Sequence, residues 1–239
     1  MSERPNERAR TATFEFEALR SAHNYRRAVL REFTPSLHGH VLEVGTGIGQ
    51  LTALLKNLPG IESLTAIEPD PALCRKFRQA LPDQPLIEGT IESLSGPHPI
   101  NAILSVNVLE HIRDDEPELA AYQKLLRATN GCLCLFVPAR PEIYARIDRD
   151  FGHHRRYTRP ELRAKLTRAG FEIVRLDYFN IAGYFAWWLN FRLLRRRRFG
   201  DGSVRLFDRV IFPVSNFLES HILRPPFGQS LIAIARART

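Results

Sequence analysis

The chain has 239 residues, of which 44% are hydrophobic, and this size suits one α/β domain over residues 1–239 with a full core. The three cysteines have no metal-binding spacing, and the N-terminus MSERPNERARTATFE is charged throughout, so we expect no signal peptide or N-terminal anchor. Ten arginines and three acidic residues follow position 181, which places almost all of the net charge of +8 in the C-terminal segment.

The first part of the chain is predicted to contain a tail and one helix. Residues 1–12 are charged and are expected to be flexible. Apolar side chains recur at near-helical spacing from Phe14 to Phe33, and Pro35 ends the pattern. We expect this helix to lie over a ligand cleft, where Tyr25 is more readily explained as a core-packing residue than as a ligand contact.

The stretch from Val41 to Thr52, VLEVGTGIGQLT, predicts a buried strand, a glycine-rich turn and the start of a helix over 50–57. Three glycines alternate in the turn: Gly45, Gly47 and Gly49. Glycine has no Cβ, so the backbone can take positive φ there and a ligand can lie against the main chain at a helix N-terminus.

The spacing of this turn indicates which nucleoside ligand it takes. A dinucleotide fingerprint needs a third small residue that packs the helix against the strand, and Gln50 stands at that position here. Glu43, inside the strand, would repel a pyrophosphate but suits a ligand with an amino group and a sulfonium. Glu68 ends the next apolar strand, where a carboxylate accepts the hydroxyls of a ribose.

The pattern E-x-G-x-G-x-G followed by Glu68 closely resembles the first motifs of the class I S-adenosylmethionine (SAM) dependent methyltransferases, and the resemblance extends from Phe14 to the C-terminus. It implies SAM as the cofactor. Thr90 stands where this family often has an aspartate that binds adenine, so that contact is expected to pass to Glu92 or to the backbone near Ile91. The implied cofactor-binding residues are Glu43, Gly45, Gly47, Gly49, Glu68, Pro69, Thr90, Ile91 and Asn107.

Strands and helices alternate along the rest of the chain, which predicts a doubly wound seven-stranded sheet of α/β type. Asp70 and Thr158 are expected to cap the helices that follow them. The resemblance implies that the seventh strand runs antiparallel to the others. The expected elements after residue 70 are helices over 71–81, 116–129 and 159–169, and strands over 85–88, 101–106, 131–137, 171–179 and 230–235.

Residues 181–228 form an insertion between the sixth and seventh strands, which the family joins directly. We expect two helices, over 181–191 and over 203–223 with a kink at Pro213, that roof the acceptor site. A short apolar helix with tryptophans and a flank of arginines, 195–198, is typical of an interfacial helix and is too short to span a bilayer. The alternative, that the apolar stripes pack on the sheet and the arginines are solvated, fits the pattern equally well.

The catalytic prediction starts from the chemistry of the donor. A methyl sulfonium is already activated, so the enzyme mainly positions the acceptor and excludes water. A hydroxyl acceptor also needs a base with a pKa near 7, which favours histidine. The catalytic candidates are His111, after the fourth strand, and His153 and Tyr157, in the loop 138–157. The residues expected to bind substrate are Asp148, His154, Arg156 and Trp187.

Several roles within this group stay open. His111 either acts as the base or caps its turn, and Asp148 either orients His153 or pairs with Arg155. Arg156 could hold a carboxylate or phosphate of the acceptor, because its guanidinium is a planar fork. No metal is expected, since the histidines lack the i, i+4 spacing of a metal pair.

The sequence therefore predicts a cytoplasmic SAM-dependent methyltransferase that acts on a small-molecule or lipid-linked acceptor, at oxygen, with peripheral membrane contact through 181–198 at the inner face of the membrane. One alternative is an RNA methyltransferase, although the arginines are interleaved with a long apolar run and nucleic acid is not the expected partner. Another is a non-catalytic partner subunit with the same fold. A nitrogen acceptor stays open, and the identity of the acceptor and the oligomeric state do not follow from the sequence.

Overall fold

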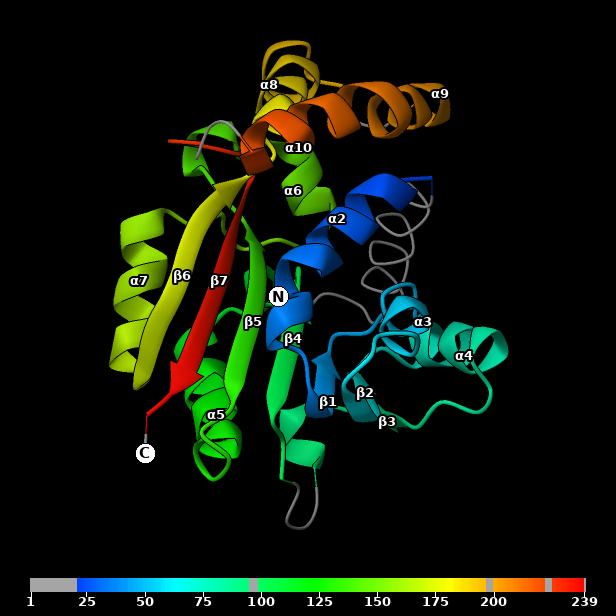
Figure 1. Ribbon diagram of the computed structural model, residues 1–239. Helices are drawn as coiled ribbons and strands as arrows, with labels where there is room; N and C mark the ends of the chain where they lie inside the picture. The colour runs from blue at the N-terminus through cyan, green and yellow to red at the C-terminus, as the bar shows by residue number, and fades with distance from the viewer. Residues whose placement is uncertain (1–20, 95–98, 197–199, 222–224, 239) are drawn as a thin grey trace, which may run out of the picture.

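The computed structural model describes residues 21–94, 99–196, 200–221 and 225–238. Its centre is one seven-stranded sheet with the strand order β3-β2-β1-β4-β5-β7-β6 (Figure 1). Five neighbouring strands pair in parallel, whereas β7 pairs antiparallel with both β5 and β6. The strands are β1 (Gly39–Val44), β2 (Ile61–Glu68), β3 (Leu86–Glu88), β4 (Ala102–Val106), β5 (Cys132–Pro138), β6 (Phe171–Phe179) and β7 (Ser230–Ala237). The predicted doubly wound seven-stranded sheet is confirmed.

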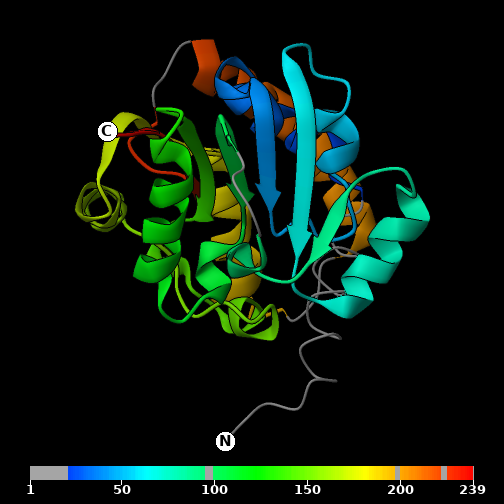
Figure 2. The same ribbon diagram turned by 90° about the horizontal axis from the view of Figure 1, so that it is seen from below.

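Helices cover both faces of this sheet (Figure 2). The α5 helix (Asp115–Arg127) and the α7 helix (Arg159–Arg168) pack on one face through buried side chains that include Tyr122 and Leu162. The α2 helix (His23–Phe33) and the short α3 helix (Thr52–Leu55) pack on the other face. The β4 and β5 strands are buried on both faces, which explains their continuous apolar sequences.

Local sequence explains where the helices begin. The carboxylate of Asp70 accepts a 2.7 Å hydrogen bond from the Ala72 amide and caps α4 (Pro71–Ala80), as predicted. Thr158 forms a capping box with Glu161 at the start of α7. The remaining helices and turns of the region before β6 are the 3-10 turns Thr34–Ser36, Ile91–Ser93, Leu109–His111 and Pro141–Ile143, and the helix α6 (Arg146–Asp150).

Two predicted boundaries are wrong. The helix after the glycine turn covers only the four residues of α3, because the turn itself extends to Leu51. The N-terminal helix begins at His23, and the predicted part over 14–20 lies outside the described residues, as does the tail 1–12.

The insertion is helical, as predicted, but its helices are irregular. The α8 helix (Ile181–Trp187) continues into a π-helical turn over Trp188–Leu193. The second helix consists of α9 (Asp201–Leu206), a π-helical turn (Phe207–Ile211) and α10 (Phe212–His221). The π-helical turn over Phe207–Ile211 thus lies just before Pro213. The nitrogen of Pro213 has no hydrogen to donate to the carbonyl of Arg209, so the regular helical bond is missing there. Among the described residues, no helix has the length and apolarity needed to cross a membrane.

The insertion lies on the outer side of α2 (Figure 1). The carboxylate of Asp208, which is buried, accepts hydrogen bonds of 3.0 and 2.9 Å from the amides of Asn24 and Tyr25 at the start of α2. Glu219 in α10 accepts 2.8 and 2.9 Å bonds from the amides of Asn180 and Ile181, which begin α8. Two carboxylates thus satisfy helix N-termini: Asp208 holds the insertion against α2, and Glu219 joins α10 to α8 within the insertion.

Candidate active site

A cavity of about 860 Å³ opens at the carboxyl ends of β1, β2 and β4, where ligands bind in open α/β sheets. The α2 helix and residues of the loop 138–157 form its other walls, so α2 covers the cleft as predicted. Seven of the predicted cofactor-binding residues line this cavity: Glu43, Gly45, Glu68, Pro69, Thr90, Ile91 and Asn107.

The three glycines of the turn have different surroundings. Gly45 lines the cavity with a φ of 70°, and a Cβ there would clash with the side chain of Val108. Gly47 donates a 2.8 Å hydrogen bond from its amide to Glu68 Oε2. Gly49 has a φ of 82°, and a Cβ there would lie 2.9 Å from the ring of Phe77 in α4. Gly47 and Gly49 therefore shape the turn, and neither lines the cavity.

Two buried carboxylates form one wall of the cavity. Glu43 accepts a 2.6 Å hydrogen bond from Thr52 Oγ1, and burial raises the pKa of Glu43 to about 7. Glu68 accepts bonds from the amides of Gly47 and Asp70, and burial also raises its pKa. A wall of this kind fits a ligand that carries cationic groups and hydroxyl donors. The sequence analysis missed Thr52, whose hydroxyl fixes the Glu43 carboxylate.

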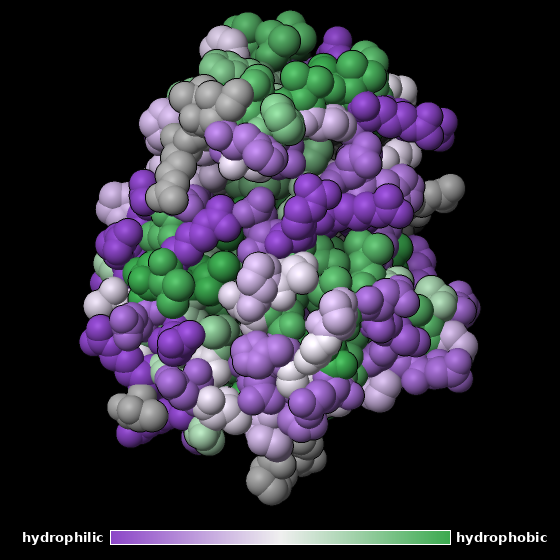
Figure 3. Space-filling view, in the orientation of Figure 1, coloured by the Kyte–Doolittle hydropathy of each residue, from purple (hydrophilic) through white to green (hydrophobic). Residues whose placement is uncertain are grey.

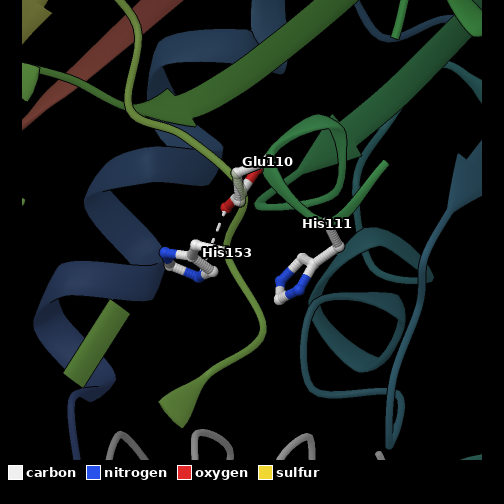
Figure 4. Close-up of side chains that lie close together, drawn as sticks. All are labelled: Glu110, His111 and His153. Carbon is white, nitrogen blue, oxygen red and sulfur yellow. Dashed lines mark ion pairs between the residues drawn. The ribbon is translucent and has the colours of Figure 1, made fainter. Parts of the chain in front are cut away.

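Figure 4 shows Glu110 and His153 pointing toward one another beside His111, and the two histidines line the cavity. His153 is buried, and its Nδ1 lies 3.2 Å from Asp148 Oδ1 while its Nε2 lies 3.9 Å from Glu110 Oε1. The rings of His111 and His153 are edge to face at 4.8 Å. Burial, together with the nearby His153 and His154, lowers the pKa of His111 to about 3, so His111 is uncharged at neutral pH.

These three residues also form a candidate metal-binding group. One potential ligand atom from each of Glu110, His111 and His153 lies within 4.8 Å of the others. Two imidazoles and a carboxylate are a ligand set that suits zinc. The sequence predicts no metal, because its histidines lack helical spacing and it has no acidic cluster; in the fold, a turn and a distant loop bring these three possible ligands together.

Tyr157 does not occupy the predicted catalytic position. Its side chain is fully buried, and its hydroxyl donates a 2.7 Å hydrogen bond to Asp115 Oδ2 in α5. Burial and the bond to Asp115 raise the pKa of Tyr157. Tyr157 does not line the cavity, so its contact with α5 replaces the predicted contact with the reacting atoms.

Three predicted substrate-binding residues form a buried cluster instead. Arg156 donates a 2.8 Å hydrogen bond from Nε to Asp148 Oδ1, and its guanidinium carbon lies 4.4 Å from the ring centre of Trp187. Arg155 pairs with Asp115 at 3.2 Å, so of the two alternatives for Asp148 the structure shows the contact with His153. None of Asp148, Arg156 and Trp187 lines the cavity. Arg156 is bound to protein groups, and the structure shows no face of its guanidinium at the cavity.

The loop 138–157 nevertheless contributes six of the residues that line the cavity. His154 lines it and is exposed, as a substrate-binding role requires. Tyr144 and Arg149 line it as well, and the Tyr144 hydroxyl donates a 2.7 Å hydrogen bond to the carbonyl of His153. The sequence analysis identified the loop but not these two residues. No described residue of the insertion lines the cavity, so α2 is the direct roof and the insertion lies above it.

Comparison with known proteins gives the family. Residues 16–176 match the methyltransferase domain family. A trans-aconitate 2-methyltransferase of Klebsiella pneumoniae (strain 342) is 31% identical over 102 residues, which cover 41% of this chain and 39% of that protein. The chain therefore matches about two fifths of this relative's length.

Two solved structures share the fold. A chain from the complex between the Haloferax volcanii Trm112 methyltransferase activator and a methyltransferase superposes with a TM-score of 0.65 at 16% identity, over 100% of both chains. The structure of the DhpI–SAH complex superposes with a TM-score of 0.60 at 16% identity, over 98% of this chain and 94% of DhpI. Because the family match covers most of its length, the chain belongs to the methyltransferase domain family, and its sheet is that of the class I SAM-dependent methyltransferases.

Proposed function

We propose that the chain transfers a methyl group from SAM, the donor of this family, to a hydroxyl oxygen of a small-molecule or lipid-linked acceptor. The observation that carries the proposal is that Glu43, Glu68 and His153 line one cavity at the carboxyl edge of the sheet. SAM supplies a methyl group that its sulfonium has already activated. The protein's own task is to position the acceptor, exclude water and accept one proton.

The acidic wall would hold the cofactor. Glu43 supplies negative charge toward the cationic groups of SAM, and Glu68 accepts the ribose hydroxyls with its remaining lone pairs. Gly45 allows close approach to the main chain. The adenine would lie on the side of the cavity that the following residues form: Pro69, Thr90 and Ile91. Asn107, which has a φ of 54°, turns the chain away at the end of β4.

His153 is the proposed base. Asp148 accepts the Nδ1 hydrogen of His153, which orients the ring and places the basic lone pair on Nε2. His111 is a poorer base, because a histidine whose pKa is about 3 holds a proton weakly at neutral pH. We therefore propose that His111 positions the acceptor while His153 takes its proton.

The insertion is proposed to contact a membrane surface or an amphiphilic acceptor. Apart from Val174, all of the exposed large apolar side chains among the described residues lie between Phe185 and Leu218. Figure 3 shows apolar side chains gathered over α8, α9 and α10. Exposed arginines, such as Arg205 and Arg209, lie on the same helices. An apolar face with basic neighbours suits an anionic interface.

The proposed activity is tested by following labelled methyl groups. The purified chain is incubated with SAM labelled in its methyl group and with a cell lysate separated into RNA, lipid and small-molecule fractions. Label in the lipid or small-molecule fraction supports the proposal, and label in the RNA fraction contradicts it. Tight SAM binding without transfer to any fraction favours a binding subunit instead.

A further inference from the structure

A second pocket, of about 360 Å³, lies between α6 and the π-helical turn that follows α8. Arginines form most of its wall. Its lining residues are Ala145, Arg146, Arg149, Phe191, Arg192, Arg195 and Arg196. The two elements are held together by a small apolar cluster in which Ile147 and Phe151 pack with Trp187 and Phe191. The pocket is thus a defined hollow between two packed elements.

Among the described residues, no carboxylate neutralises the arginines of this pocket. Within the described residues, none of the five guanidinium groups forms an ion pair with a carboxylate at 4.0 Å or less. Other arginines of the neighbouring loop do form such pairs, among them Arg155 with Asp115 and Arg156 with Asp148. Five like charges around one hollow repel each other, and an anion in the hollow would remove this repulsion.

An arginine, Arg195, takes the left-handed backbone conformation at the end of the π-helical turn. Arg195 has a φ of 52°, and the amide of Arg196 donates a 2.9 Å hydrogen bond to the carbonyl of Asn190. A left-handed residue after a helix is usually glycine or asparagine. The arginine at this position places one more cation on the wall of the pocket.

Arg149 connects the two cavities, because it lines both the pocket and the main cavity. A ligand seated among the arginines therefore lies next to the main cavity, which His153 and Glu43 also line. Guanidinium groups bind phosphate oxygens in pairs, and several of them together suit a group with two or more negative charges.

We propose that this arginine pocket binds a phosphate or diphosphate group of the methyl acceptor. The inference names the acceptor class and in that respect rests on the proposed methyl transfer. The phosphate belongs either to a soluble phosphorylated molecule or to a lipid headgroup, and both present the same oxygens to the pocket. Arg156 is buried against Asp148, so we assign this role to the five arginines of the pocket.

The test measures binding of inorganic pyrophosphate to the full chain by calorimetry at low salt. Arg192→Gln and Arg195→Gln remove one pocket charge each, and Arg163→Gln, an exposed arginine of α7 outside both the pocket and the insertion, is the matched control. We expect pyrophosphate to bind one site, each pocket variant to bind about tenfold or more weakly, and the control to bind as the wild type does. Equal losses in pocket and control variants, or no binding to the wild type, would overturn the proposal.

A second arm identifies the source of the phosphate. The same variants are sedimented with vesicles that contain phosphatidylglycerol or only phosphatidylcholine. Weaker binding of the pocket variants, but not of the control, to the phosphatidylglycerol vesicles supports a lipid headgroup, whereas loss only in the pyrophosphate arm supports a soluble acceptor. SAM affinity is measured on each variant as well. If SAM fails to bind while pyrophosphate binding remains specific to the pocket, the proposed methyl transfer fails and the anion site stands.

Discussion

Asp148 Oδ1 lies 3.2 Å from His153 Nδ1 and 2.8 Å from Arg156 Nε, so one buried carboxylate oxygen orients the histidine and is itself held by an arginine. The guanidinium keeps the aspartate in place, and the aspartate fixes which nitrogen of His153 carries the hydrogen. This relationship preorganises His153 for its proposed role as the base.

Replacing the base should separate catalysis from cofactor binding. We expect His153→Gln to lower kcat by about 10²–10⁴-fold while SAM affinity changes little, since a general base acts only on the acceptor proton. Asp148→Asn should lower kcat as well, because it removes the orienting charge. The matched control is His221→Gln, an exposed histidine of α10. Full turnover by His153→Gln would show that proximity alone drives the transfer.

The raised pKa of Glu43 should make both stability and SAM affinity depend on pH. Burial holds the pKa of Glu43 at about 7, whereas in the unfolded chain this carboxyl ionises near 4.5. The folded state therefore binds more protons between these values, and the free energy of unfolding should fall by up to about 3 kcal/mol as the pH rises through this window. Cationic SAM favours the ionised carboxylate, so its affinity should rise as the pH passes 7.

The comparison for this prediction is Glu43→Gln, which cannot ionise. Chemical denaturation and calorimetry at pH 5.5 and pH 8 should show a smaller pH dependence of both quantities in the variant. An identical pH dependence in wild type and variant would mean that Glu43 is not the titrating group.

Chelation tests the group formed by Glu110, His111 and His153. We expect methyl transfer to continue after treatment with EDTA, because the proposed proton transfer to His153 needs no metal. Metal analysis of the purified chain provides a readout independent of turnover. Loss of activity on chelation, with recovery on addition of zinc, would instead assign the three side chains to a metal site.

The apolar face of the insertion should contribute to membrane binding. We expect the double variant Phe185→Ser and Phe217→Ser to sediment with anionic vesicles at least several-fold less than the wild type, since each side chain loses apolar area that the membrane would bury. Val174→Ser, an equally exposed position on β6, is the control. Wild-type chain that stays in the supernatant with anionic and neutral vesicles alike would leave the insertion as a soluble element above α2.

The sequence was sufficient to predict the sheet and the wall of the cavity that Glu43 and Glu68 form. Apolar runs, the Asp70 cap and the glycine turn are local signals, and Brändén's rule for the carboxyl ends of parallel strands then brings Glu43 and Glu68 together. These features need no knowledge of distant contacts, so they could be predicted.

The features that the sequence did not reveal depend on contacts between distant segments. Tyr157 and Arg156 have the chemistry of active-site residues, but α5 and Trp187 bury them. In the same way, the Asn24 amide at the start of α2 donates a hydrogen bond to Asp208, which lies 184 residues later in the chain. The arginine pocket lies between α6 and the π-helical turn that follows α8. No local sequence pattern indicates that these two elements contact each other.

Calorimetry of SAM binding to the wild type and to Glu68→Ala shows whether the cavity at the ends of β1 and β2 holds SAM. We expect one SAM per chain, and a loss of about 1.5–3 kcal/mol in the variant, because two charge-assisted hydrogen bonds to the ribose disappear. Glu62→Ala, an exposed carboxylate on β2, should bind SAM as the wild type does. If the wild-type chain fails to bind SAM, or binds NAD more tightly, the cavity is not a SAM site.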